Sequence, residues 1–205
     1  MRSVPPLWER LQPRAFRIAA TCMQELAAEA APTRGSYRYD PIMMELPTIR
    51  VALVTRELAA QVRALRVAPD QYSFVGDVEF NLVDAERDPQ SDAMAILAGD
   101  EVIGFYRLDY APTVVAWKPV PASVGLRSFL IDRRHQGHGY GAAAIEACCA
   151  DLRRRHPERH LLALNVNCIN RGAIRAYRKA GFVDTGELYF GGRAGPQHLM
   201  LRSLD

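Results

Sequence analysis

Hydrophobic residues follow two different periods along this chain, and the places where the period changes predict its elements. Short apolar, often β-branched runs predict strands at residues 49–54, 93–97, 101–109, 125–131, 161–166, 185–190 and 197–201. Apolar residues at steps of three and four predict helices after Thr55 and over residues 74–86, 139–155 and 171–179. Gly99 predicts a hairpin, and the long helix between two strands predicts one parallel crossover. The pattern therefore predicts an α+β fold, with a mostly antiparallel sheet flanked by helices.

The first 45 residues predict an N-terminal helical extension. An amphipathic helix begins after Pro13 and ends before Pro32, and a linker with Gly35 and Ser36 follows. We therefore divide the chain into this extension, at residues 1–45, and a main domain at residues 46–205. The apolar stripe of the helix fits either its own domain or a second copy of the chain, so a homodimer is one expectation.

Composition and charge narrow the class of protein. The chain has 205 residues, is 49% hydrophobic and carries a net charge of +3, which argues against disorder and gives no reason to expect nucleic acid as a partner. No apolar run is long enough to cross a membrane. The four cysteines have no CxxC spacing, so we expect reduced thiols, no bound metal and a cytoplasmic location.

The segment between the strand at 125–131 and the next helix is the most informative part of the chain. Glycines alternate in it at positions 137, 139 and 141. Glycine allows a close approach to the backbone, and the first turn of a helix carries unpaired N–H groups with a partial positive charge. A strand, a glycine loop and a helix in this order therefore predict a socket for a phosphate or pyrophosphate.

Two known motifs compete for this loop. Residues 137–142 match the dinucleotide pattern GxGxxA, but that pattern expects an acidic residue about 20 positions on, and the next strand ends in Val166-Asn167-Cys168. The same loop also contains Gln136-x-x-Gly139-x-Gly141, and in this it resembles the GCN5-related N-acetyltransferase (GNAT) family.

The resemblance extends downstream and covers about residues 49–205. The family commonly shows the pattern V-x3-N-x2-A-x3-Y-x3-G-F after its fifth strand. Here the matching residues are Val166, Asn170, Ala173, Tyr177, Gly181 and Phe182. The spacing predicts that Asn170, Ala173 and Tyr177 share one helix face.

This resemblance implies an enzyme that transfers an acetyl group from acetyl-CoA directly to a primary amine. It implies that the backbone of Phe129, Leu130 and Ile131 follows the pantetheine arm and the acetyl group. It implies that the pyrophosphate is held by the backbone of Gln136, Gly137, His138, Gly139, Tyr140, Gly141 and Ala142. Asn170 would contact the arm of the co-substrate, and Tyr177 would protonate the departing thiolate.

Charge is distributed unevenly, in a way that fits two such substrates. Residues 133–179 hold ten basic and three acidic side chains, which suits a polyanionic co-substrate. Residues 77–101 hold eight acidic side chains and one arginine, which predicts either a wall that attracts a cationic amine or an exposed acidic face. Gln71-x-x-Phe74-Val75 resembles the spermine/spermidine branch of the family, so we expect a polyamine or another small amine.

The general base is not evident from the sequence. The strand at 125–131 has no acidic residue, although many family members carry one there. Glu79 and Asp109 are the best candidates, and a water relay is equally acceptable. Two other functions stay open: acetylation of protein lysines or N-termini, and sensing of acyl-CoA without turnover.

Overall fold

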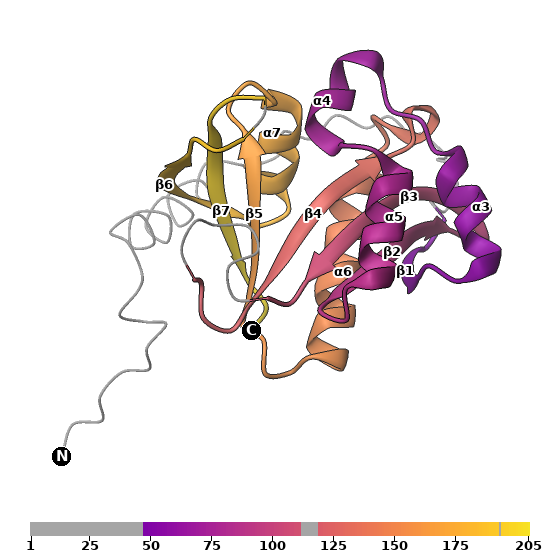
Figure 1. Cartoon of the computed structure of the whole chain (residues 1–205), viewed down its shortest axis with the longest axis horizontal. Helices are drawn as coiled ribbons and strands as arrows, with labels where there is room; N and C mark the ends of the chain where they lie inside the picture. The colour runs from indigo at the N-terminus through magenta and orange to yellow at the C-terminus, as the bar shows by residue number, and fades with distance from the viewer. Residues whose placement is uncertain (1–46, 112–118, 193) are drawn as a thin grey trace, which may run out of the picture. The chain divides into compact units, whose positions relative to one another are not determined.

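The computed structural model describes residues 47–205, except 112–118 and 193. In this part of the chain one sheet has the strand order β1-β2-β3-β4-β5-β7-β6 (Figure 1). Only β4 and β5 pair in parallel. The strands are β1 (Ile49–Leu53), β2 (Ser91–Ala98), β3 (Glu101–Asp109), β4 (Ser123–Ile131), β5 (Leu161–Asn167), β6 (Val183–Tyr189) and β7 (Gln197–Ser203). The predicted fold class is confirmed.

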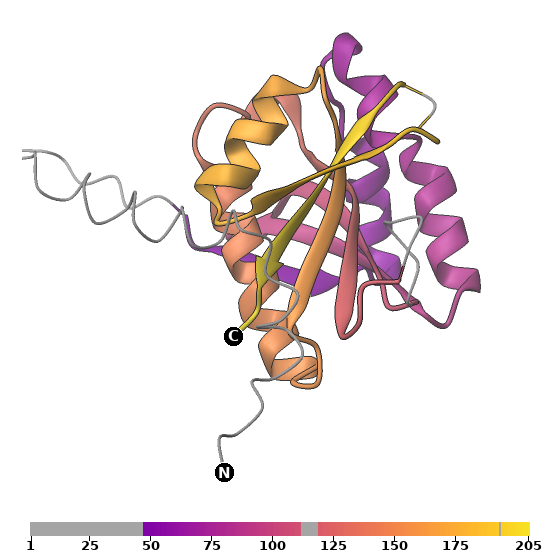
Figure 2. The same cartoon turned by 90° about the vertical axis from the view of Figure 1, so that its left-hand side faces the viewer.

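Helices cover both faces of this sheet. They are α3 (Arg56–Ala64), α4 (Tyr72–Val75), α5 (Val78–Arg87), α6 (Tyr140–Arg155) and α7 (Arg171–Lys179). One buried cluster joins α3 and α5 to the sheet, and a larger one joins α6 and α7 to the opposite face. Figure 2 shows these two groups of helices on either side of the strands. No helix in the described ranges is both long and apolar enough to cross a membrane.

The helix predicted at residues 74–86 is wrong as a single element, because the chain breaks at Gly76. Gly76 has a φ of 73°, a left-handed conformation that ends α4. The carboxylate of Asp77 then accepts a hydrogen bond from the amide of Phe80 at 2.7 Å and begins α5. The glycine ends one helix and the aspartate begins the next as its N-cap. The periodicity of apolar residues does not reveal either boundary.

The crossover from β4 through α6 to β5 positions the site. The two strands pair only over Ser123–Gly125 and Leu161–Ala163. Beyond these residues the two strands diverge, as Figure 1 shows. The predicted extension at residues 1–45 lies outside the described residues, so that division of the chain and the homodimer stay predictions.

Candidate active site

The end of β4, the glycine loop, α4 and α7 border a cavity of about 390 Å³, which we call the glycine-loop cavity. Of the residues expected to hold the co-substrate, those that line it are Phe129, Leu130, Ile131, Gln136, Gly137, Gly139, Tyr140, Gly141, Ala142, Asn170 and Tyr177. His138 is the exception: it is exposed, and its ring stacks on Tyr140 at 5.7 Å. The end of β4, the glycine loop, the start of α6 and α7 thus bring these side chains and amides together at one cavity.

The glycine loop leaves backbone N–H groups free to bind an anion. Gly137 and Gly139 have φ values of 83° and 82°, a conformation that other residues adopt at a cost. Gly139 is the N-cap of α6 and has no side chain to satisfy the first turn. Among the described residues, none accepts a hydrogen bond from the amides of Gly139, Tyr140 or Gly141. These free donors and the helix dipole fit a diphosphate such as that of coenzyme A.

Gln136, the first residue of the loop motif, uses its side chain to position the loop. Its Nε2 donates to the carbonyl oxygen of Ile131 at 2.8 Å and to Oε1 of Gln71 at 2.9 Å. Nε2 of Gln71 donates back to Oε1 of Gln136 at 3.2 Å. The paired amides tie the loop both to the end of β4 and to the segment before α4.

Asn170, Ala173 and Tyr177 all line the glycine-loop cavity, which agrees with the shared face that the spacing predicts. Asn170 precedes α7 as its N-cap, and its Oδ1 accepts a hydrogen bond from the amide of Ala173 at 3.1 Å. Its Nδ2 donates to no described residue and can face a ligand. The sequence spacing could not distinguish a capping position from a first helical turn.

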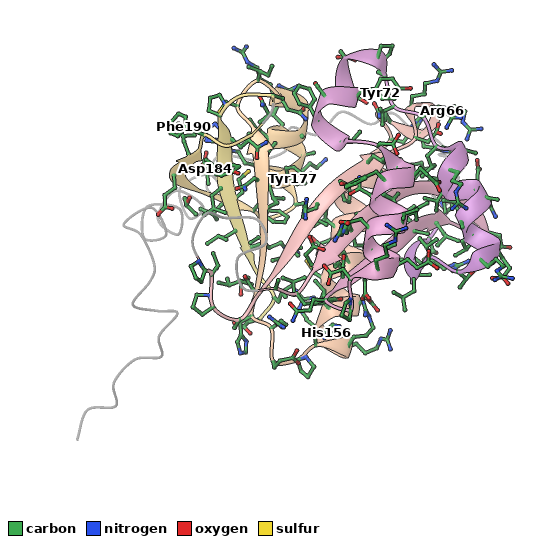
Figure 3. All side chains as sticks on the ribbon, viewed as in Figure 1. Arg66, Tyr72, His156, Tyr177, Asp184 and Phe190 are labelled. Atoms are coloured by element: carbon green, nitrogen blue, oxygen red, sulfur yellow. The ribbon has the colours of Figure 1, made fainter. Side chains whose placement is uncertain are left out.

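Tyr177, labelled in Figure 3, lies in an aromatic cluster. Its ring meets those of Phe129 and Phe182 edge to face, with centroids 6.2 and 5.5 Å apart. No described residue forms a hydrogen bond with its hydroxyl. Burial raises the pKa of Tyr177 above its ordinary value, so the phenol stays protonated at working pH. A protonated phenol can donate to a departing sulfur.

A second cavity, of about 340 Å³, lies next to the first, and we call it the α4–α5 cavity. Val67, Val75 and Leu130 line both cavities. The charged residues of the second cavity are Arg63, Arg66, Asp77 and Glu79. Figure 3 shows Arg66 and Tyr72, which also lines it, on the α3–α4 side of the molecule, away from Asp184 and Phe190 at β6.

Glu79, one of the two candidate bases, lies in the wall of the α4–α5 cavity. Both of its oxygens accept hydrogen bonds from Arg63, at 2.5 and 3.2 Å. These hydrogen bonds lower the pKa of Glu79. A carboxylate held in its ionised form attracts a cation well but accepts a proton poorly.

Asp109, the other candidate base, is buried away from both sets of lining residues. Its carboxylate accepts hydrogen bonds from Arg107 at 2.8 Å, Arg127 at 2.7 Å and the hydroxyl of Ser91 at 2.6 Å. Arg107 also pairs with Asp84. The arrangement is a buried charge network beneath α5, in which each acid has a basic partner.

The eight acidic side chains of residues 77–101 therefore do not act together. Asp84 and Asp88 pair with Arg107, and Asp92 pairs with Arg155. Only Asp77 and Glu79 line the α4–α5 cavity. The arginines that pair with Asp84, Asp88 and Asp92 come from β3 and α6, outside this stretch of the sequence, so a local count of charges could not reveal them.

Several residues at the two cavities were not assigned a role from the sequence. Gln71 and Phe74 were noted only as a likeness to one branch, yet both line the glycine-loop cavity. Lys179, at the end of α7, lines it as well. The pairing of Gln71 with Gln136 joins residues 65 positions apart. No local pattern could have predicted that contact.

Known proteins resemble this chain in sequence. The family model described as "Acetyltransferase (GNAT) family" matches residues 59–182. A spermine/spermidine N(1)-acetyltransferase of Bacillus subtilis is 28% identical over 146 residues, which are 71% of this chain and 94% of that protein.

Solved structures agree in fold. The spermidine N-acetyltransferase of Vibrio cholerae, in complex with CoA and spermine, superposes with a TM-score of 0.58 at 18% identity, covering 77% of this chain and 96% of that chain. The aminoglycoside acetyltransferase AAC(6')-Ib in complex with coenzyme A gives a TM-score of 0.61 at 19% identity, covering 76% and 94%. The chain belongs to the GNAT acetyltransferase family, and it is an acetyl-CoA-dependent N-acetyltransferase.

Proposed function

We propose that the enzyme acetylates a small cationic amine bound in the α4–α5 cavity, and that polyamines are its substrate class. One observation carries the proposal: the two cavities meet at Leu130, and the second one has the carboxylates of Asp77 and Glu79 in its wall. A thioester lying along β4 from the first cavity and an amine in the second would meet at this residue. Holding two reactants side by side supplies a large part of the rate.

The names of similar proteins support the same substrate class. The relative from Bacillus subtilis is a spermine/spermidine acetyltransferase, and the structure from Vibrio cholerae contains spermine. The third protein is, by its name, an aminoglycoside acetyltransferase. The first two names support a polyamine as the substrate class.

The residues of the two cavities divide the work of the reaction. Acetyl-CoA, held by the amides of Gly139, Tyr140 and Gly141, supplies the acetyl group as a thioester. Glu79 attracts and orients the cationic amine, and its lowered pKa means that the proton leaves to solvent rather than to this carboxylate. Backbone N–H groups near Leu130 or Ile131 meet the negative charge that develops on the carbonyl oxygen. Tyr177 donates its proton toward the departing sulfur.

The proposal predicts opposite effects for the two members of the Arg63–Glu79 pair. Glu79→Gln removes the charge that attracts the amine and should raise the KM for spermidine about fivefold, with kcat nearly unchanged. Arg63→Gln releases Glu79 from its partner and should lower that KM. Steady-state assays with radiolabelled acetyl-CoA measure both. Glu86→Gln removes the same charge from an exposed position of α5 outside both cavities, and its KM should match that of the wild type.

A panel of acceptors tests the substrate class itself. Spermine, spermidine and putrescine should accept label better than primary monoamines of similar length, which carry a single positive charge. If radiolabelled acetyl groups are transferred to peptide lysines or peptide N-termini in preference to polyamines, the enzyme is a protein acetyltransferase and the proposal is wrong. Saturable binding of acetyl-CoA without transfer to any amine would replace it with a sensor.

A further inference from the structure

The strand β4 carries an irregularity at the point where the two cavities meet. Arg107 of β3 is paired with Arg127 of β4, and Phe105 with Leu130. Two residues of β4, Ser128 and Phe129, therefore lie opposite one residue of β3. This is a β-bulge, in which one strand holds one residue more than its partner.

The bulge decides which side chain faces which cavity. Before it, Val124 and Leu126 belong to the cluster under α6 and α7. After it, Phe129 packs on that same cluster, whereas Leu130 belongs to the cluster under α3 and α5. Side chains alternate along a strand, so one extra residue reverses every later position. Without the bulge, Leu130 would face Tyr177, and Phe129 would face the α4–α5 side.

Ser128 holds the bulge in a conformation that a serine rarely adopts. Its φ is 50°, in the left-handed region that favours glycine. Such a backbone persists only where neighbouring groups hold it, and these positions gather at active sites. Apart from Ser128, the only other residue besides glycine with positive φ in the described ranges is Ala122, at the opposite end of β4.

A chain of hydrogen bonds connects this strained residue to the wall of the α4–α5 cavity. The hydroxyl of Ser128 donates to Oδ1 of Asn81 at 2.9 Å. Nδ2 of Asn81, a buried residue of α5, donates to the carbonyl oxygen of Asp77 at 2.7 Å. Asp77 is the residue that caps α5 and lines the cavity. Both polar atoms of the Asn81 amide are thus satisfied, as burial requires.

We propose that the Ser128–Asn81 hydrogen bond is a positioning device for acetyl transfer, which holds the β4 bulge so that the backbone beyond it faces the thioester while Leu130 faces the amine. Ser128 and Asn81 are positioning residues, because they act through the backbone of Phe129 and Leu130. The inference rests on acetyl transfer along β4 but not on the identity of the amine.

The test compares Ser128→Ala and Ser128→Gly with the control Ala122→Gly. Alanine keeps the strained φ and loses the hydroxyl, whereas glycine relieves the strain and also loses the hydroxyl. Ala122→Gly relieves the same strain at the other end of β4. The readouts are kcat with the best amine of the panel, the thermal midpoint, and the calorimetric Kd values of CoA and acetyl-CoA.

Ser128→Ala should lower kcat about tenfold or more, because a small misplacement of a reacting group is costly. Ser128→Gly should lose less kcat, because glycine adopts the positive φ without help from the hydrogen bond. The Kd for CoA should stay within twofold of the wild type in both variants, since the glycine loop is placed separately. The ratio of the Kd of CoA to that of acetyl-CoA should fall toward one, because only the acetyl group depends on the bulge. Ala122→Gly should leave all of these values unchanged. The double variant Asn81→Ala/Ser128→Ala should lose no more kcat than the worse single variant.

An unchanged kcat and an unchanged Kd ratio in Ser128→Ala would overturn the inference. A loss of affinity for CoA as large as the loss for acetyl-CoA would also overturn it, since that result means general damage to the site. If the wild type acetylates no amine of the panel, the proposal about the substrate fails. The ratio of the two Kd values still tests the positioning role of the Ser128–Asn81 hydrogen bond. A wild-type ratio of one would contradict it directly.

Discussion

At the scale of single residues, the chemistry depends on how neighbours set protonation. Arg63 lowers the pKa of Glu79, and burial raises the pKa of Tyr177. The carboxylate is therefore ionised and the phenol protonated across the working range of pH. Neither group needs to change its charge before the reaction. The pH dependence of the reaction should therefore come from deprotonation of the amine substrate.

The pH dependence of the wild type and of Tyr177→Phe tests this division of roles. In the wild type, kcat/KM should rise with pH from 7 to 9.5, because an alkyl amine with a pKa of about 10 loses its proton over that range. Tyr177→Phe should lower kcat by about 10²-fold at every pH, with the same shape of profile and an unchanged KM for acetyl-CoA. Tyr189→Phe, outside the lining of both cavities, is the control.

Two outcomes would contradict that account. A titration near pH 6, in place of the continued rise, would indicate a general base with a raised pKa. An unchanged kcat in Tyr177→Phe would remove the phenol from the departure of the thiolate.

At the scale of elements, the approach of β3 to β4 depends on one glycine. A Cβ at Gly104 would lie 2.5 Å from the carbonyl oxygen of Leu130 and 2.9 Å from Cδ1 of Ile96. The backbone oxygen cannot move without disturbing the strand beyond the bulge. A residue in the middle of β3 thus determines how closely β4 can be held.

Gly104→Ala should therefore destabilise the fold by about 1–3 kcal/mol, as overpacking of a core does. Gly172→Ala, in α7, places its Cβ no closer than 3.9 Å to the atoms around it and should stabilise the helix by up to about 1 kcal/mol. Urea denaturation of the two variants beside the wild type measures the difference. Equal free energies of unfolding for both variants would contradict the close approach at Gly104.

The elements were predictable where local patterns determine them. The glycine loop, the crossover and the cap at Thr55 all follow from short segments, and the structure has them. The break at Gly76 was missed because its signal is one residue inside an apolar period. The bulge at Ser128 was missed because its cause, the hydrogen bond to Asn81, lies 47 positions away.

The site was predictable only in part, for the same reason. Motif spacing selected the residues of the glycine-loop cavity, because loop and helix are contiguous in sequence. The α4–α5 cavity arises from packing between α3, α4 and β4, and its ion pair joins residues 16 positions apart on two helices. The partners of the acidic side chains were equally distant, so the sequence overstated the charge that faces an amine.

At the scale of the whole described domain, the sheet separates two kinds of binding. The glycine loop and α7 offer free amides and a phenol to an anionic co-substrate. The start of α5 offers the carboxylates of Asp77 and Glu79 to a cation, and Arg63 of α3 holds Glu79 in place. The strand β4 runs between them, and its residue Leu130 lines both cavities. The central claim is that the amides at the start of α6 hold coenzyme A.

A calorimetric titration of coenzyme A into the wild type, Gly139→Ala and Gly99→Ala tests that claim most directly. Both glycines have positive φ, and an added Cβ would have no neighbour within 4 Å at either, so the two variants carry matched backbone strain. The account predicts saturable binding with one site per chain for the wild type and for Gly99→Ala, and binding at least about tenfold weaker for Gly139→Ala. No saturable heat with the wild type, or equal affinity in both variants, would contradict it.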